Sequence, residues 1–265
     1  MTRAEYHVHS AASYDSEASP EEIVDRALAA GLDVLCVTDH DTIDGALAVQ
    51  ARANRALRVV VGCEFTCDDG SHVLGLGLTG MIPERRVLPL LDRLEAHGAT
   101  VVLPHLFRRG SGVFRPELRR APEFVRDVLA RTDAVECFNA RDTFENNARS
   151  QRFAAERGLP TIAGSDAHRA AELGRAFVEY RDAAFVHGAS ARRIFFPTQA
   201  AAVESPVKRR VMELYHRNER RLPPVVRRAY RALRRQLRAD GPRRAEAEPR
   251  LQYDLPPAAP ERIWP

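Results

Sequence analysis

The sequence has few cysteines and no long apolar run, and each scarcity excludes a class of protein. A transmembrane helix needs about 18 consecutive apolar residues, and no such run is present. The N-terminus enters the first expected strand without a signal-peptide core, so we expect a cytoplasmic protein. No Cys-x-x-Cys pair occurs, and four cysteines in 265 residues are too few for a disulfide scaffold. We therefore expect reduced core thiols at Cys36, Cys63, Cys67 and Cys137.

Lysine is almost absent, and the charge is unevenly distributed. Lys208 is the only lysine among forty basic residues, a bias that we attribute to the base composition of the genome rather than to function. The net charge of +4 combines sixteen basic and seven acidic residues between 206 and 265, a balance of +9, with −5 over residues 1–205. The basic character therefore belongs to the C-terminal segment.

The composition and patterning predict an α/β domain with an appendage. With 45% hydrophobic and 29% charged residues, the chain is typical of a soluble globular protein. From Glu5 to about Tyr180, short apolar runs alternate with amphipathic helical stretches, which indicates repeated βα units and a mainly parallel sheet or barrel. We expect a barrel domain over residues 1–205 and an appendage over residues 206–265.

Capping residues and apolar runs place the expected elements. The capping box Ser19-Pro20-Glu21-Glu22 opens a helix that stops at Gly31. Gly98 and Gly158 close two later helices, expected at 83–97 and about 146–157. The expected strands lie at residues 4–9, 33–38, 58–62, 72–78, 99–104, 135–139 and 160–164.

The first expected strand carries two histidines with one residue between them. Alternation along a strand puts His7 and His9 on one face and Val8 on the other. Two imidazoles on one face make half of a site for a divalent metal. Taken alone, the pair is equally compatible with two ordinary polar residues of a strand that bind no metal.

Other residues of metal-binding type lie on the first strand or directly after later strands. In an α/β barrel the C-terminal ends of the strands converge on one rim, where active sites form. A single histidine there is commonly structural, but nine such residues in register with successive units indicate a metal site. The candidate ligands are His7, His9, Asp15, His40, Glu64, His72, His105, Asp166 and His168.

These residues stand in motifs that resemble a known family. In order, the motifs are His7-x-His9-Ser10, Thr38-Asp39-His40-Asp41-Thr42, Gly62-x-Glu64, His72-Val73-Leu74-Gly75, Pro104-His105 and Gly164-Ser165-Asp166-Ala167-His168. As an ordered set over residues 4–180, they are similar to the PHP (polymerase and histidinol phosphatase) superfamily of metal-dependent phosphoesterases. The resemblance implies a distorted (β/α)7 TIM-like barrel with two or three divalent metals at its C-terminal rim.

The resemblance also implies a ligand set. One metal would be held by His7, His9, Glu64 and Asp166, a second by Glu64, His72 and His105, and a third by Asp15, His40 and His168. Mixed imidazole and carboxylate ligation fits Mn²⁺, Fe²⁺ or Zn²⁺ better than Mg²⁺ or Ca²⁺. A metal-activated water would attack a phosphate ester directly, without a covalent enzyme intermediate.

Further charged residues flank the motifs. Arg108 and Arg109 follow His105 and suit a phosphate group of the substrate, although a solvated loop is the equal alternative. Asp39 and Asp41 could orient imidazoles, or Asp41 could serve a helix N-terminus. The candidate catalytic residues are Glu64, Asp166, Arg108 and Arg109.

The C-terminal segment predicts two arginine-rich amphipathic helices separated by Pro223-Pro224, followed from Gly241 by a loosely ordered, Pro-rich tail. One interpretation packs the apolar stripes on the barrel and leaves the arginines solvated. The other is an electrostatic contact with nucleic acid or an anionic membrane surface.

The leading hypothesis is a hydrolase acting on a phosphate ester of a small metabolite or a nucleotide. A second is a 5′-3′ exonuclease on RNA or DNA oligonucleotides, with the basic segment holding the polynucleotide. A third is a non-catalytic scaffold whose metals are structural and which presents its C-terminal helices to a partner. The sequence leaves the substrate, the metal and the oligomeric state open.

Overall fold

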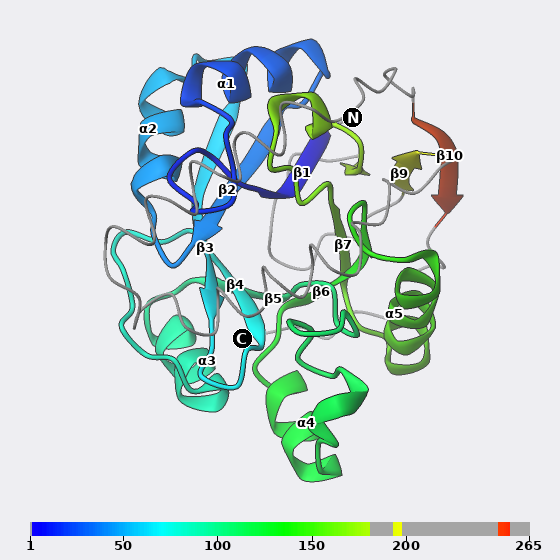
Figure 1. The fold of residues 1–265 in the computed structure, drawn as a ribbon. Helices are drawn as coiled ribbons and strands as arrows, with labels where there is room; N and C mark the ends of the chain where they lie inside the picture. The colour runs from blue at the N-terminus through cyan, green and yellow to red at the C-terminus, as the bar shows by residue number, and fades with distance from the viewer. Residues whose placement is uncertain (1, 181–192, 198–248, 255–265) are drawn as a thin grey trace. The chain divides into compact units, whose positions relative to one another are not determined.

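Strands and helices alternate along the chain, as the sequence predicts. The computed structural model describes residues 2–180, 193–197 and 249–254, all within one compact unit formed by residues 1–201 and 248–265 (Figure 1). The strands are β1 (Thr2–Val8), β2 (Val34–His40), β3 (Arg58–Thr66), β4 (His72–Leu76), β5 (Thr100–Leu103), β6 (Ala134–Asn139), β7 (Thr161–Gly164), β8 (Phe177–Tyr180), β9 (Arg193–Pro197) and β10 (Pro249–Asp254). The α-helices are α1 (Pro20–Ala29), α2 (Asp44–Arg52), α3 (Val87–Ala96), α4 (Pro122–Leu129) and α5 (Phe144–Arg157). Two short 3-10 helices cover Pro116–Leu118 and Ala170–Glu172.

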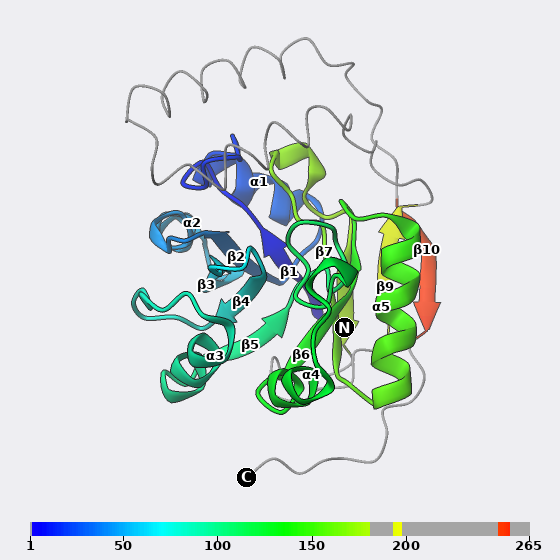
Figure 2. The same ribbon diagram turned by 60° about the horizontal axis from the view of Figure 1, so that its bottom comes forward.

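The strands form one mixed sheet in the order β10-β9-β8-β1-β2-β3-β4-β5-β6-β7. The sheet curves so that its β7 end returns to β1, where Val8 bridges Ala167 just past β7, and β1 to β8 therefore make a nearly closed barrel. Figure 2 shows β1 to β7 as a ring, with α1, α2, α3 and α5 on its outside. The predicted distorted barrel of the PHP type is confirmed.

The barrel departs from an all-parallel arrangement at β4. Pairs β1–β2, β2–β3, β5–β6 and β6–β7 are parallel, whereas β4 is antiparallel to both β3 and β5. The reason is local: β3 and β4 are joined by a five-residue turn, 67–71, in which Gly70 adopts a φ of +83°. A turn this short allows only a hairpin, since a parallel crossover needs a dozen or more residues.

The apolar core is divided into two clusters, one between the strands and the helices outside the barrel and one inside the barrel. The outer cluster joins strand residues such as Leu35 and Val61 to helix residues such as Ile23 and Leu90. The inner cluster contains residues of the strands and their connections, and is represented by Tyr6, Val34, Leu76, Val102 and Ile162. The strand ends therefore project from a packed barrel, which fixes the positions of the polar residues that follow them.

Capping explains the helix boundaries. Ser19 and Glu22 form the predicted capping box at α1. Thr143 caps α5, and Gly158 ends it in the left-handed conformation with φ +60°. The expected start of the third helix at residue 83 is wrong, because α3 begins at Val87. Pro89 then occupies the first turn, where its missing N–H costs nothing, whereas a start at residue 83 would place it in the helix interior.

Within residues 206–265, the structure describes one strand, residues 249–254. Residues 249–254, expected in the loosely ordered tail, form β10 and pair antiparallel with β9. The alternation of Leu251 and Tyr253 with Arg250, Gln252 and Asp254 is a strand pattern that the surrounding prolines obscured. The two arginine-rich helices expected between 206 and 240 lie outside the described residues. Among the helices of the described ranges, none is long and apolar enough to cross a membrane.

Candidate metal centre

The end of β1 delivers two imidazoles to one point. The pairing of β1 with β2 shifts register between Glu5 and Val8. Val8 then packs in the outer cluster, whereas the Nε2 atoms of His7 and His9 lie 3.1 Å apart in the site. Both imidazoles are fully buried, so their nitrogens must find partners inside the protein.

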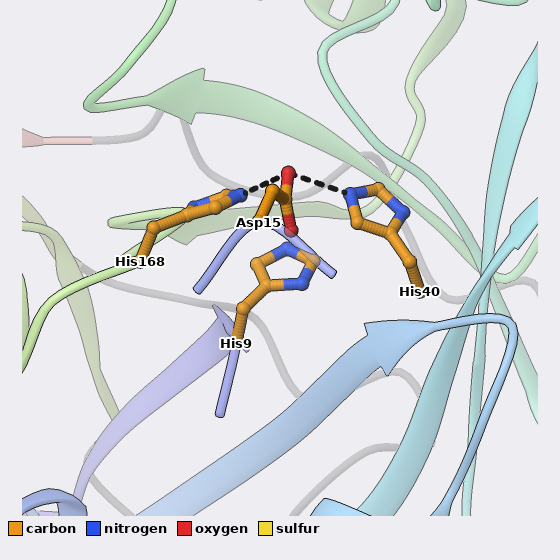
Figure 3. Close-up of side chains that lie close together, drawn as sticks. All are labelled: His9, Asp15, His40 and His168. Atoms are coloured by element: carbon orange, nitrogen blue, oxygen red, sulfur yellow. Dashed lines mark hydrogen bonds and ion pairs between the residues drawn. The ribbon is translucent and has the colours of Figure 1, made fainter. Parts of the chain in front are cut away.

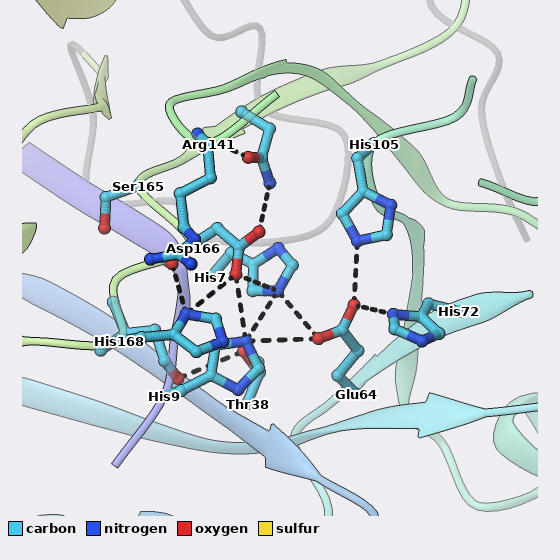
Figure 4. A network of polar contacts seen from close by, with 12 residues as sticks. His7, His9, Thr38, Glu64, His72, His105, Arg141, Ser165, Asp166 and His168 are labelled. Carbon is cyan, nitrogen blue, oxygen red and sulfur yellow. Dashed lines mark hydrogen bonds and ion pairs between the residues drawn. The ribbon is translucent and has the colours of Figure 1, made fainter. Parts of the chain in front are cut away.

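Glu64, on β3, lies at the centre of the cluster. Its Oε1 is 2.7 Å from Nδ1 of His72 and 3.0 Å from Nε2 of His105. Its Oε2 is 3.2 Å from Nε2 of both His7 and His9 (Figure 4). One buried carboxylate therefore contacts imidazoles from β1, β4 and the end of β5, which is the geometry that a bridging ligand requires.

A further group gathers around Asp15. Its Oδ2 lies 2.9 Å from Nε2 of His168 and 3.5 Å from Nε2 of His40 (Figure 3). The ring of His9 lies between these residues, with centroids 4.6 Å from His40 and 4.3 Å from His168. The Oδ1 atom of Asp15 is buried and has no hydrogen-bond partner. An unpartnered buried carboxylate oxygen is costly unless a cation lies beside it.

All nine predicted ligands come together. Within residues 2–180, their potential ligand atoms fall into overlapping groups whose members lie within 4.8 Å of one another. The overlap through His7, His9, His40 and Glu64 makes one continuous cluster. The groups are His9–Asp15–His40–His168, His7–His9–Asp166, His7–Glu64–His105 and His40–Glu64–His72.

Two hydrogen-bond acceptors, the carboxylate of Glu136 and the backbone carbonyl of Asp166, fix the tautomers of two imidazoles. Nδ1 of His7 lies 3.1 Å from a carboxylate oxygen of Glu136, and Nδ1 of His168 lies 2.7 Å from the carbonyl oxygen of Asp166. Each acceptor requires an N–H at Nδ1, which leaves the Nε2 lone pair directed into the cluster.

His9 reaches the same state through Ser13. The Ser13 hydroxyl donates to Asp39 at 2.8 Å and accepts from the backbone N–H of His40 at 2.9 Å. Since its only proton goes to Asp39, the hydroxyl can only accept from Nδ1 of His9, 3.1 Å away. Asp39 therefore orients His9 through Ser13.

The carboxylates of the cluster are held in the ionised form. Burial alone would raise the pKa of Glu64, but the imidazoles of His72, His40 and His7 hold it well below the usual range. The pKa values of Asp15 and Asp166 are likewise well below their usual range despite burial, because histidines surround both carboxyl groups and Arg108 also faces Asp166.

The pKa values of the imidazoles shift in both directions. Burial lowers the pKa of His40, yet Glu64 and Asp15 outweigh it and raise this pKa to about 10. For His105, burial and then the charge of Arg108 lower the pKa to about 3. Its imidazole is therefore uncharged, the form that can bind a metal ion through a ring nitrogen. The negative charge that raises the pKa of His40 also attracts divalent cations, and the nitrogen and carboxylate donors of the cluster fit Mn²⁺, Fe²⁺ or Zn²⁺.

The predicted arginine pair separates. The guanidinium of Arg108 donates to Oδ2 of Asp166 at 2.8 Å and to Oδ1 of Asn139 at 2.6 Å. The side chain of Arg109 is 77% exposed and lies 3.5 Å from Glu117. Arg108 therefore belongs to the surroundings of the cluster, whereas Arg109 points to the surface.

Sequence reasoning missed Glu136 and Asn139, both on β6. Glu136 accepts from the backbone N–H of His105 at 2.8 Å and from Asn139 at 2.9 Å, in addition to its contact with His7. The signal was available, because Glu136 is a charged residue inside the otherwise apolar run Ala134–Phe138, and a carboxylate is buried only where it has partners.

Left-handed backbone also marks the site. Four described residues other than glycine have positive φ values: Asp41 (+55°), His105 (+28°), Arg119 (+43°) and Asp166 (+53°). Arg119 lies away from the cluster, whereas Asp41 directly follows β2 and His105 and Asp166 are the second residues after β5 and β7. Such conformations are unfavourable for a side chain and concentrate at functional sites. Here the turn at His105 and Asp166 aims each side chain at the cluster.

The comparisons with known proteins agree with this geometry. The PHP domain family matches residues 5–189. The chain is 30% identical over 132 residues to the 5′-3′ exoribonuclease of Haemophilus influenzae, covering 43% of this chain and 46% of that protein. It is 37% identical over 82 residues to the 3′,5′-nucleoside bisphosphate phosphatase of Chromobacterium violaceum, covering 29% of this chain and 28% of that protein. The chain thus spans less than half the length of either relative.

A solved structure shows the same fold. A two-domain protein from Bacteroides vulgatus, described as containing a predicted PHP-like metal-dependent phosphoesterase, superposes with a TM-score of 0.54 at 18% identity, over 76% of this chain and 60% of that one. The shared barrel, the continuous ligand cluster and the family match over residues 5–189 lead to one conclusion. The chain belongs to the PHP domain family of metal-dependent phosphoesterases.

Proposed function

We propose that this protein hydrolyses a phosphate ester of a small metabolite or a nucleotide with metal-activated water. The observation that carries the proposal is the convergence of nine imidazole and carboxylate side chains, Glu64 and Asp15 among them, into one cluster. A barrel that served only as a scaffold would have no need for so many buried, charged groups, each of which is costly without a cation.

The proposed ligand set follows the contacts of Glu64 and Asp15. His7, His9 and Asp166 would hold one ion with Oε2 of Glu64. Glu64 would reach a second ion together with His72 and His105, which both lie against its Oε1. The remaining group, Asp15, His40 and His168, would hold a third. Bound there, divalent ions would supply an activated water near neutral pH and neutralise charge on the phosphoryl oxygens.

Around that centre the chain's own residues have distinct tasks. Glu136 and Ser13 keep the protons of His7 and His9 on Nδ1, so that Nε2 stays free. Arg108 holds one oxygen of Asp166 and is 24% exposed, which also allows its guanidinium to meet a phosphate group. We assign no role to Arg109, since its side chain lies against Glu117.

A second candidate function is a 5′-3′ exonuclease. It is favoured by the similarity to the Haemophilus influenzae exoribonuclease over residues that make up 43% of the chain. The similarity to a nucleoside bisphosphate phosphatase favours a small nucleotide instead. Both candidate functions use the same cluster of proposed metal ligands. They differ only in the size of the substrate, which is a small phosphate ester in one and an oligonucleotide in the other.

One experiment tests the proposal and separates the candidates. The purified chain is analysed for bound metal and assayed on a panel of phosphate esters, with Asp166→Ala and His9→Ala as site variants and Arg93→Ala as the surface control. We expect bound Mn, Fe or Zn and turnover that both site variants lose. Mononucleotides released from a labelled oligonucleotide would identify the exonuclease. Metal without turnover on any ester, together with a specific protein partner, would favour the scaffold.

A further inference from the structure

A basic groove lies beside the loop that follows β5 and shares no residue with the ligand cluster. It encloses about 540 Å³ between that loop, α4 and α5. Its lining contains three phenylalanines and one acidic residue, Glu156. The remaining charged residues of the lining are all arginines: Arg115, Arg119, Arg120, Arg149, Arg152 and Arg157. This lining suits an anionic ligand that also has flat, apolar parts.

Two of the arginines place their guanidinium groups over aromatic rings. The guanidinium carbon of Arg149 is 3.9 Å from the ring centroid of Phe107, and that of Arg157 is 3.9 Å from the ring centroid of Phe153. The two rings pack edge to face, with centroids 5.6 Å apart. A guanidinium stacked on a ring on one side presents its other side as a flat cationic surface.

The free positive charge concentrates on one face of α5. Arg149, Arg152 and Phe153 follow one another at helical spacing, and both arginines are exposed. By contrast, Arg115 is buried and donates to Ser71 and to backbone carbonyls, and Arg120 is paired with Asp69. Arg157 lies 3.3 Å from Glu156 but keeps an exposed side chain. The arginines most available to a ligand are therefore Arg149 and Arg152 on α5, with the exposed Arg119 on the other side of the groove.

The groove and the ligand cluster meet in the same loop. Phe107 lines the groove, and the next residue, Arg108, donates to Asp166 of the cluster. His105, two residues earlier, contacts Glu64. A chain lying in the groove would therefore have one end directed toward the cluster.

We infer that this groove binds single-stranded nucleic acid through phosphate contacts and through bases stacked on Arg149 and Arg157. Stacking on guanidinium planes and repeated phosphate contacts are the means by which proteins hold unpaired strands. An acidic polypeptide satisfies the charge but supplies no flat face for the stacked guanidinium groups. The direction of the strand toward the cluster rests on the proposed function, whereas the binding itself does not.

The test measures binding without turnover. Metal-loaded full-length protein is titrated into labelled, phosphorothioate-linked RNA and DNA of about ten nucleotides, a length within the range that single-strand grooves hold. The groove variant is Arg149→Ala/Arg152→Ala. The matched control is Arg55→Ala/Arg93→Ala, which removes the same charge from two exposed positions outside the groove and keeps the basic C-terminal segment.

We expect the groove variant to bind at least about ten-fold more weakly, and the slope of log K against log salt to fall by about 1.4, or about 0.7 for each lost phosphate contact. The control should bind like wild type. Arg149→Lys/Arg152→Lys should keep the salt slope but lose affinity, because it keeps both charges and loses the stacked guanidinium plane of Arg149. A preference for RNA or for DNA would show which sugar the groove reads.

Two results would overturn the inference. One is equal binding by the groove variant and the control. The other is polyglutamate of matched charge competing as well as the oligonucleotide. Hydrolysis of p-nitrophenyl phosphate by the wild-type protein tests the proposed function separately. If the wild type hydrolyses no ester but the groove variant alone loses oligonucleotide binding, the proposed function fails and the groove inference stands.

Discussion

The Nδ1 atom of His7 lies 3.1 Å from Oε1 of Glu136, with both side chains fully buried. The other carboxylate oxygen accepts from the backbone N–H of His105 at 2.8 Å and from Asn139 at 2.9 Å. One side chain on β6 therefore sets the ring of a ligand from β1 and the backbone of a ligand after β5. Its effect on metal binding is testable without changing any proposed ligand.

Glu136→Gln should weaken metal binding by about 10- to 100-fold. The amide oxygen must take the place that faces His105 and Asn139, so the amide NH₂ faces Nδ1 of His7. His7 is then driven to the tautomer with its proton on Nε2, where the metal would bind. Chelator competition at fixed free Zn²⁺ or Mn²⁺ measures the change, and Glu123→Gln, exposed on α4, is the control. Equal affinity for both variants would contradict the role given to Glu136.

Ser13→Ala should lower the free energy of unfolding by about 1–3 kcal/mol, the usual cost of leaving buried polar groups unpaired. The change removes the acceptor for the backbone N–H of His40 and for Nδ1 of His9. Urea denaturation at saturating metal measures the loss. Ser111→Ala is the matched control, since Ser111 serves His72 through its backbone carbonyl rather than its hydroxyl. Equal stability of the two variants would show that Ser13 does not support the site.

The convergence of the candidate ligands could be predicted because most of them lie on a recognisable strand or shortly after one. His7, Glu64 and Asp166 stand on or directly after apolar runs, and parallel strands bring such positions to one rim. The order of motifs then identified the family and its barrel. Local signals also sufficed for α1, where the capping box Ser19–Glu22 forms as expected.

The supporting contacts were not predictable in the same way. Glu136 belongs to no motif, and its partners His7 and His105 lie 129 and 31 positions away. The separation of Arg108 from Arg109 depends on the left-handed backbone at His105 and the turn after it, which no periodicity reveals. The contacts of Glu136 and the orientations of Arg108 and Arg109 depend on long-range partners and on turn geometry. Hydrophobic periodicity predicts only where helices and strands lie.

Glu5 should make stability fall as pH rises. Burial raises its pKa to about 7, although contacts with Ser165 and Gly174 act in the opposite direction. The folded protein therefore keeps this proton after the unfolded chain has lost it near 4.5, and the stabilisation disappears between about pH 4.5 and 7. The total is at most about 3.5 kcal/mol, from about 1.4 kcal/mol for each pH unit.

Glu5→Gln should remove this dependence, because a neutral amide does not titrate in this range and its oxygen can still accept from the N–H of Gly174. The difference in free energy of unfolding between variant and wild type, measured at pH 5 and pH 8 in the same metal state, should grow in favour of the variant. Glu95→Gln, exposed on α3, should show no such change. Parallel pH curves for Glu5→Gln and wild type would refute the buried, protonated Glu5.

Arg108→Lys should lower kcat/KM for a phosphate ester by about 10- to 100-fold, the cost of about 1–3 kcal/mol for losing charge-assisted hydrogen bonds. An ammonium group cannot reproduce the fork that reaches Asp166 and Asn139 together. Arg109→Lys is a matched neighbour whose exposed side chain lies by Glu117, and it should stay near wild type. Steady-state kinetics on both variants checks the difference, and equal losses would place both arginines at the substrate.

Gly164→Ala should destabilise the protein and weaken metal binding together. A Cβ atom at this last residue of β7 would lie 2.5 Å from Cβ of His7 and 2.6 Å from Oε1 of Glu136. It would therefore collide with both members of the His7–Glu136 contact, which orients the imidazole of the proposed ligand His7. Overpacking of this kind costs about 1–3 kcal/mol of stability. Gly80→Ala is the matched control, because no atom lies within 4 Å of the position its Cβ would take. Thermal unfolding and chelator competition should both separate the two variants; a Gly164→Ala protein that is destabilised but binds metal normally would mean that the His7–Glu136 contact does not govern the ligand.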